Sequence, residues 1–77
     1  MRLEVLLVSP SEVIFEGELR SLILPGESGV FELMAFHKGI TSRLVSGVVF
    51  LDDRPLRIRK GVMKARGNRV TIVCEPA

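Results

Sequence analysis

The chain has 77 residues and a formal net charge of +2. A domain of this size buries only about 60% of the surface that its unfolded chain exposes, so its stability is expected to be marginal without a partner. Little room remains for both a core and a deep catalytic cleft, because ligand pockets usually need about 300 Å³ or more. The length therefore favours a single interaction module over residues 1–77 and disfavours an enzyme.

The single cysteine, Cys74, cannot form an intramolecular disulfide, which fits a reducing compartment and excludes a cluster of thiolate metal ligands. The first apolar run carries Glu4 and stops at Pro10, so it does not suit a signal peptide. No segment approaches the roughly 18 apolar residues of a transmembrane helix. We therefore predict a soluble protein of the cytoplasm.

Short runs of alternating apolar and polar residues fill the first half of the chain. Proline and glycine interrupt a strand, so the runs are expected to end at these residues. In the third run, Leu19, Ser21 and Ile23 are expected on one face, opposite Leu22 and Leu24. The predicted strands are 3–7, 13–17, 19–24 and 30–33, with breaks at Ser9-Pro10-Ser11, Gly17 and Pro25-Gly26.

The second half continues the pattern, with strands expected at 40–45 and 48–51. The segment Asp52-Asp53-Arg54-Pro55 is typical of a turn, because aspartate bonds its neighbouring backbone and proline fixes φ. A run with Leu56, Ile58 and Val62 leads to Gly67-Asn68, a hairpin signal, and Val70, Ile72 and Cys74 close the pattern. Many short strands without a helical window predict an all-β antiparallel sandwich or barrel.

The only histidine, His37, has no second histidine or cysteine at metal-ligand spacing, so a zinc site is not expected. A Ser-His-Asp triad could be assembled on paper from Ser28 or Ser42, His37 and Asp52. Any sequence with several serines allows this, and no nucleophile elbow accompanies it. We therefore predict no catalytic residue.

Two other chemical interpretations are weak. Asp52 and Asp53 could be paired acid-base carboxylates, but adjacent strand residues point to opposite faces, which favours the turn. Gly26 and Gly29 could form a phosphate loop, but no GK[ST] motif follows and Glu27 would repel a phosphate. No cofactor or metal is expected.

Charge is distributed unevenly, with most glutamates in the first half and most basic residues in the second. On a strand, Arg57 and Arg59 would share a face opposite Leu56 and Ile58. The alternative function is therefore a small basic β-barrel that binds nucleic acid, although the chain has no tyrosine or tryptophan to stack on bases. Its binding residues would be Arg57, Arg59, Lys64, Arg66 and Arg69.

A series of short motifs extends from Leu3 to Glu75. They are Leu3-Glu4-Val5, Val8-Ser9-Pro10, Phe15-Glu16-Gly17-Glu18, Leu24-Pro25-Gly26-Glu27-Ser28-Gly29, His37, Ser46-Gly47-Val48-Val49, Gly61-Val62 and Gly67-Asn68-Arg69-Val70-Thr71-Ile72. No single motif is specific, but their order and spacing are. In this series the chain resembles the N-terminal β-sandwich domain of the epsilon subunit of rotary ATP synthases, called delta in mitochondria.

The resemblance implies a flattened sandwich of about ten short antiparallel strands. It also implies a non-catalytic rotor subunit at the foot of the central stalk of an F-type ATP synthase, which couples the gamma subunit to the c-ring. Such a subunit would lie peripherally on the cytoplasmic face of the inner membrane and touch the membrane only through the c-ring. Binding of nucleic acid would not be expected.

The resemblance places the c-ring contact in the loop after Pro25 and in the loop that carries the histidine. Gly26 and Gly29 permit positive φ, so the first loop can project from the edge of the sandwich. The predicted c-ring contacts are Glu27, Ser28, Gly29, Val30 and His37.

A gamma-binding face needs exposed apolar side chains, because a stable interface buries roughly 1,000 Å² or more. Four apolar residues alternate out of phase with the expected core. The predicted gamma contacts are Leu6, Val8, Ile14 and Leu22.

The chain departs from the family pattern in two places. Ala35-Phe36 precedes the histidine where the family usually has Pro-Gly, and Lys38-Gly39-Ile40-Thr41 follows it in place of Ala-Pro-Leu-Leu. The sequence also stops at Ala77, without the two-helix hairpin with which most bacterial members inhibit ATP hydrolysis and some bind ATP. Inhibition of that kind and nucleotide sensing are thus expected to be absent. A naturally short subunit and a piece of a longer one both stay open.

Overall fold

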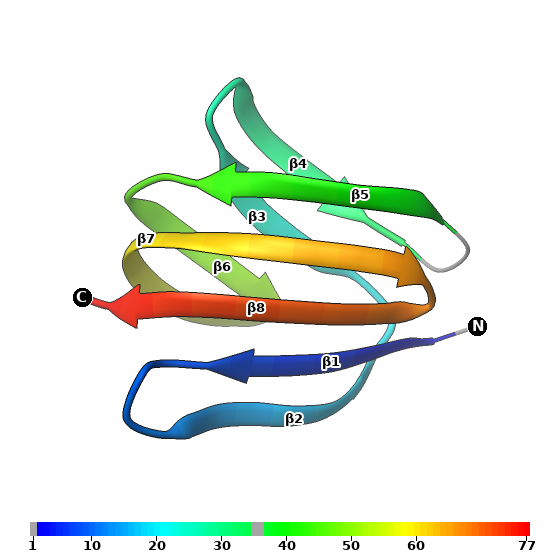
Figure 1. The fold of residues 1–77 in the computed structure, drawn as a ribbon, viewed down its shortest axis with the longest axis horizontal. Helices are drawn as coiled ribbons and strands as arrows, with labels where there is room; N and C mark the ends of the chain where they lie inside the picture. Colours follow the sequence, from blue (N-terminus) through cyan, green and yellow to red (C-terminus); the bar gives the residue numbers. More distant parts are fainter. Residues whose placement is uncertain (1, 35–36) are drawn as a thin grey trace.

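The structure, a computed structural model, describes residues 2–34 and 37–77, with only the backbone described at 37–38. Over these residues the chain forms strands and turns and no helix, as the alternating pattern predicts. The strands are β1 (Leu3–Val8), β2 (Val13–Leu19), β3 (Leu22–Gly26), β4 (Gly29–Leu33), β5 (His37–Leu44), β6 (Gly47–Leu51), β7 (Arg54–Gly67) and β8 (Arg69–Pro76) (Figure 1).

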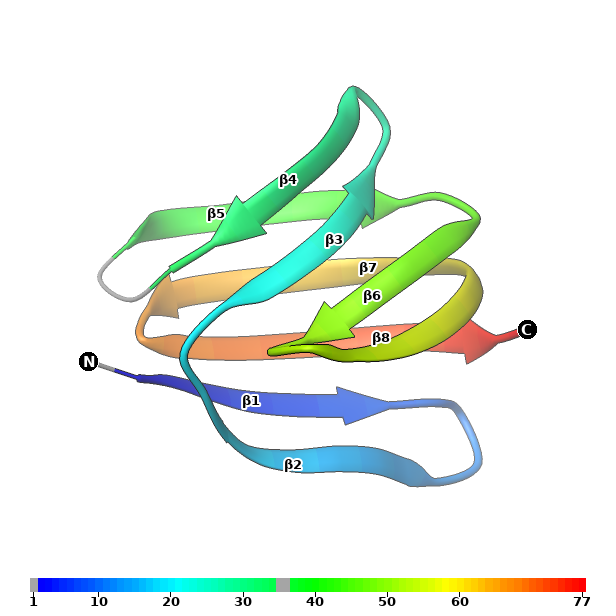
Figure 2. The same ribbon diagram turned by 180° about the vertical axis from the view of Figure 1, so that it is seen from behind.

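The strands form two layers that cross each other obliquely (Figures 1 and 2). The first layer has the strand order β2-β1-β8-β7-β5, and the second consists of β6, β3 and β4. The pairing of β1 with β8 is parallel, and the other pairings between the described strands are antiparallel. The strand β7 joins the layers, because its first residues pair with β6 and the rest pair with β5 and β8.

The predicted flattened β-sandwich is therefore confirmed, but the described residues form eight strands instead of about ten. Part of the difference arises because β7 runs for 14 residues from one layer into the other and counts as one strand instead of two. Pro55, which we interpreted as a turn residue, lies in this strand opposite Phe50. A proline fits there because Leu51 and Arg54 form the hydrogen-bonded pair that closes the hairpin, and the next pair makes no bonds across the two strands.

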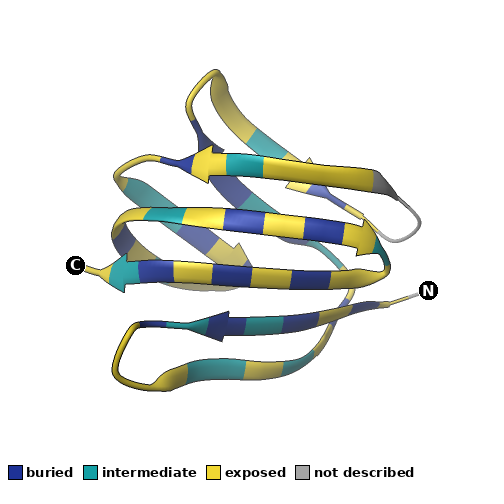
Figure 3. Ribbon diagram, viewed as in Figure 1, coloured by how far each residue is buried: buried dark blue, intermediate teal, exposed yellow. Residues whose placement is uncertain are grey.

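The inward side chains of both layers form one apolar core, which appears as the alternation of buried and exposed residues along β7 and β8 in Figure 3. Ile14, Phe15, Phe31 and Leu56 pack against its margin. The core consists of Leu3, Val5, Leu7, Leu19, Leu22, Leu24, Leu33, Leu44, Val49, Leu51, Ile58, Met63, Ala65, Val70, Ile72 and Cys74.

The predicted third strand is two strands with different phases. Leu19 ends β2 and Leu22 begins β3, and both are buried, with a corner at Arg20-Ser21 between them. Alternation carried through this corner assigned Leu22 and Leu24 to the wrong face. They belong to the core, and their exposed fractions are 0%.

Asp52, at the turn between β6 and β7, holds this corner. Its Oδ1 accepts hydrogen bonds from the backbone N–H of Arg20 at 2.9 Å and of Ser21 at 3.0 Å, and its own N–H donates to the Ser21 carbonyl at 3.2 Å. The φ of Asp52 is 57°, a left-handed conformation that aspartate and asparagine tolerate better than most residues. The neighbouring Arg54 guanidinium lies 5.2 Å from the centre of the Phe15 ring. The interpretation of Asp52-Asp53 as turn residues is confirmed.

We expect Asp52→Ala to destabilise the domain by about 2 kcal/mol, because two backbone donors lose a charged acceptor. For a domain of this size, that loss lowers the melting temperature by roughly 10 °C in a thermal melt followed by circular dichroism. Asp52→Asn keeps an acceptor oxygen and tolerates the positive φ, so its cost should be less than half as large. Asp53→Ala, at an exposed neighbour, should change stability by no more than about 0.5 kcal/mol. Equal losses for Asp52→Ala and Asp53→Ala would contradict this account of the corner.

A bulge in β7 changes which residues face the core. The register with β8 shifts between Ile58 and Lys60, so the buried positions change from Ile58 to Met63 and Ala65. Val62, which the sequence pattern grouped with Leu56 and Ile58, consequently points outward and is 49% exposed.

Candidate interaction surfaces

The hairpin of β3 and β4 projects from the end of the sandwich (Figures 1 and 2). Glu27 and Ser28 form its two-residue tip, and Gly26 pairs with Gly29 below them. Gly29 has a φ of 128°, as a projecting turn requires. Gly26 does not adopt positive φ. A glycine fits at this position because a Cβ there would lie 2.8 Å from the Phe31 ring. Residues 27–30 are all exposed.

The hairpin tip and His37 lie at opposite ends of β5. Gly26 pairs with Leu44 at the end of this strand, whereas His37 begins it and pairs with Gly67. Seven residues of extended chain separate these points by roughly 23 Å. The predicted c-ring contacts therefore do not form one small patch. The side chain of His37 lies outside the described residues, as do Ala35 and Phe36, where the chain departs from the family pattern.

Four valines cross the outer face of the first layer in one row. Val8 pairs with Val13 on β2 and with Val73 on β8, and Val73 pairs with Val62 on β7. Paired residues project from the same face of a sheet, so the four side chains are neighbours. Val13, Val62 and Val73 are 57%, 49% and 47% exposed. We refer to Val13, Val8, Val73 and Val62 as the valine row.

A shallow groove of about 390 Å³ adjoins the valine row. Val62 and Val73 form its apolar wall, and Arg43 and Lys60 lie at its margin. Gly61 contributes to its floor, where a Cβ would lie 2.8 Å from the Val73 carbonyl oxygen. The outer face at this end is therefore slightly concave, with apolar valines bordered by charged residues, among them the Lys60–Glu75 ion pair at 3.5 Å.

The four predicted gamma contacts fall in three environments. Val8 is part of the valine row, and Leu6 lies one step along β1 on the same face; both are half-buried. Ile14 is the extra residue of a bulge in the pairing of β1 with β2 and packs against the core. Leu22 is fully buried, so its assignment to a partner-facing surface is wrong. Sequence alternation missed Val13, Val62 and Val73, because strand pairing brings them together.

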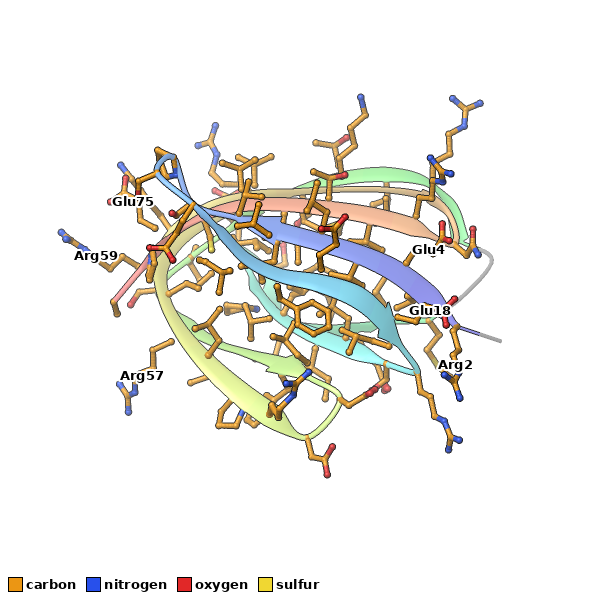
Figure 4. The ribbon with its side chains drawn as sticks, turned by 90° about the horizontal axis from the view of Figure 1, so that it is seen from below. Arg2, Glu4, Glu18, Arg57, Arg59 and Glu75 are labelled. Carbon is orange, nitrogen blue, oxygen red and sulfur yellow. The ribbon has the colours of Figure 1, made fainter. Side chains whose placement is uncertain are left out.

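Charged residues also occupy the other end of the outer face. Glu4 pairs with the guanidinium of Arg69 at 3.4 Å, and Arg2 approaches Glu18 at 3.8 Å. Arg57, Arg59 and Glu75 lie at the opposite end of the molecule from Arg2, Glu4 and Glu18 (Figure 4). Lys64 and Arg66 lie beside Arg69 on β7 and β8, so the five candidate basic residues are divided between the two ends of the molecule and do not form one stripe.

Aromatic side chains give little support to the nucleic-acid alternative. Phe15 and Phe31 are half-buried against the core, and the Arg54 guanidinium lies over the Phe15 ring. Phe50 is 37% exposed on the other layer. The described residues therefore offer no group of neighbouring, fully exposed aromatic rings on which successive bases of single-stranded nucleic acid could stack.

The residues considered for catalysis are not assembled. Asp52 follows Leu51, which pairs with Leu22 at the start of β3, whereas Ser28 lies beyond the other end of that strand. Ser42 donates a hydrogen bond to the Arg43 carbonyl at 3.3 Å. Among the described side chains, those of residues 2–34 and 39–77, no three histidine, cysteine or acidic groups could jointly hold a metal ion. Burial raises the pKa of the Cys74 thiol, which keeps it protonated.

The described ranges contain no helix that is long and apolar enough to cross a membrane. What they contain is a two-layer β-sandwich with a projecting hairpin at one end and an exposed apolar row across one layer. This arrangement defines a small interaction domain.

Comparison with known proteins identifies the family. Residues 2–77 match the family described as ATP synthase, Delta/Epsilon chain, beta-sandwich domain. An ATP synthase epsilon chain of Chlorobium limicola is 31% identical over 74 residues, which cover 90% of this chain and 84% of the relative. An epsilon chain of Sulfurimonas denitrificans is 30% identical over 82 residues, covering all of this chain and 62% of the relative. The chain therefore belongs to the ATP synthase delta/epsilon family, as its β-sandwich domain.

Solved structures share the fold. A chain from the central stalk and c-ring of the Tetrahymena thermophila mitochondrial ATP synthase superposes with a TM-score of 0.78 at 10% identity, covering 97% of this chain and 64% of that one. A chain of the Euglena gracilis mitochondrial ATP synthase gives a TM-score of 0.84 at 15% identity, covering 95% and 50%. The sandwich is thus retained at low sequence identity.

Proposed function

We propose that this chain is a non-catalytic central-stalk subunit of an F-type ATP synthase and that it couples the gamma subunit to the c-ring. Residues 1–77 would act as a single domain in this role. The family match over residues 2–77 carries this proposal. The chain would do so by binding both partners at once, so that they rotate as one body. It would lie peripherally on the cytoplasmic face of the membrane and reach the membrane only through the ring.

The valine row, together with Leu6, is the surface best suited to gamma. It is apolar and exposed, and it lies on a rigid layer of five paired strands. A stable interface of about 1,000 Å² in total would take roughly 500 Å² from each partner, about a tenth of the 5104 Å² surface of this chain. Four neighbouring aliphatic side chains can form the centre of such a patch.

The hairpin tip is the surface best suited to the c-ring, because it projects beyond the sandwich and carries Val30 with 73% exposure. This arrangement leaves the two partners on separate parts of the domain, as coupling requires. Size-exclusion chromatography of the chain with purified gamma, followed by sedimentation with the purified c-ring, tests the proposal. Failure of the unaltered chain to form a complex with either partner at micromolar concentration would overturn it.

Val30→Lys should weaken attachment to the c-ring at least tenfold, because an exposed apolar contact is replaced by a charge that must be desolvated. Binding to gamma and thermal stability should stay unchanged, since the side chain makes little contact within the domain. Sedimentation of the labelled variant with the ring measures the effect. Phe50→Lys, an exposed apolar residue of β6 away from the tip, is the control and should bind the ring normally. Equal ring binding by Val30→Lys and the unaltered chain would place the contact elsewhere.

A further inference from the structure

The strand β4 forms an open edge of the sandwich. It pairs with β3 on one side, and no strand of the described residues lies on its other side (Figure 2). The other terminal strand, β2, is better protected against a foreign strand, because it contains a bulge at Ile14 and carries Glu16 and Glu18. The edge of β4 carries one charged residue, Glu32.

The register shows which backbone groups of β4 point outward. A two-residue turn makes Gly26 and Gly29 a hydrogen-bonded pair, so the next pair, Pro25 and Val30, makes no bonds between the strands. The Pro25 carbonyl confirms this alternation, because it accepts a bond from the Val45 N–H at 2.9 Å, on the side away from β4. By the same alternation, the N–H and C=O groups of Val30 and Glu32 point away from β3.

The charge of the hairpin is complementary to a basic partner. From Leu22 to Leu33, the charged side chains are Glu27 and Glu32, both exposed, within a chain whose net charge is +2. The ion pairs Arg2–Glu18, Lys60–Glu75 and Arg69–Glu4 involve neither of them. An extended segment beside β4 would place one of its side chains opposite Glu32, while Glu27 lies at the tip of the hairpin.

We propose that β4 is a strand-addition site, where Val30 and Glu32 exchange backbone hydrogen bonds with an extended, lysine- or arginine-bearing segment of the partner that the hairpin contacts. Two outward N–H groups and two outward C=O groups are complementary to another backbone, and Glu32 selects a basic side chain. This inference rests on the proposed function, because the segment would belong to the c-ring, the partner that we assign to the hairpin tip. It adds a mode of recognition along the strand to the contact at the tip.

Glu32→Pro and Glu32→Gln separate the backbone contribution from the charge. Proline removes the outward N–H of residue 32 and leaves the bonds to β3 intact, as Pro25 and Pro55 already do on their strands. Glutamine removes the charge and keeps the N–H. We expect Glu32→Gln to weaken binding to the purified c-ring about threefold relative to the unaltered chain. Glu32→Pro should bind the ring at least tenfold more weakly than Glu32→Gln does. Equal binding by the two variants would overturn strand addition while leaving the stalk role intact.

Amide hydrogen exchange of the unaltered, isotope-labelled chain tests the same bonds without a substitution. In the complex with gamma and the c-ring, the Val30 and Glu32 amides should exchange at least tenfold more slowly than in the free chain. Unchanged exchange at both amides in the complex would overturn the proposal, even if Glu32→Pro failed to fold. No complex with the unaltered chain would overturn the proposed function and this inference together. A free chain that is a dimer and becomes a monomer with Glu32→Pro would identify a second copy as the occupant and exclude the rotor segment.

Discussion

Leu22→Ala is expected to reduce the free energy of unfolding by about 2–5 kcal/mol, because it opens a cavity at a fully buried position between the two layers. A domain of this length has roughly 4–12 kcal/mol of stability in total, so the variant should lose much of its resistance to urea. Urea unfolding followed by circular dichroism measures the loss as a lower midpoint with an unchanged slope.

Leu6→Ala provides the matched control, since it removes the same atoms from a half-buried position on the outer face. Its cost should be below about 1.5 kcal/mol, because less apolar surface returns to water and no enclosed cavity forms. A Leu22→Ala variant as stable as Leu6→Ala would mean that Leu22 does not fill the core, and the original assignment of this residue to a partner surface would become tenable again.

Val73→Lys is expected to weaken the complex with gamma at least a hundredfold, because a lysine at the centre of the valine row interrupts the apolar patch and must be desolvated on binding. The domain itself should keep its melting temperature within about 4 °C, since the side chain is 47% exposed and points away from the core. Titration of labelled chain with purified gamma, followed by fluorescence anisotropy, gives the dissociation constant.

Phe50→Lys again serves as the control, because it places a lysine at an exposed apolar position of the other layer. It should bind gamma like the unaltered chain. If Phe50→Lys weakens the complex and Val73→Lys does not, gamma binds the layer of β3, β4 and β6, and the role that we propose for the valine row is wrong.

The sequence by itself determined the fold class and most of the local structure. Alternation with period two, with breaks at glycine and proline, located the strands near 3–7, 30–33, 40–45 and 48–51. Turn chemistry also acts locally, so Asp52-Asp53 was correctly interpreted as a turn and Gly67-Asn68 as the hairpin between the last two strands. These features depend on residues next to each other in the chain, which is why the sequence reveals them.

Tertiary structure decided the faces and the surfaces. A corner at Arg20-Ser21 reversed the expected phase of β3 and buried Leu22, and a bulge near Arg59 exposed Val62. One added residue moves every later side chain to the opposite face of a strand, and no local pattern records it.

The pairing of distant strands was equally beyond the sequence. The parallel contact of β1 with β8 brings Val8 beside Val73, although most of the chain separates them in sequence. The pairings of β5 place the β3–β4 tip and His37 at its opposite ends. Local alternation says which side chains can share a face, but burial of the whole core selects which strands lie side by side, and that selection creates the valine row and the open edge of β4.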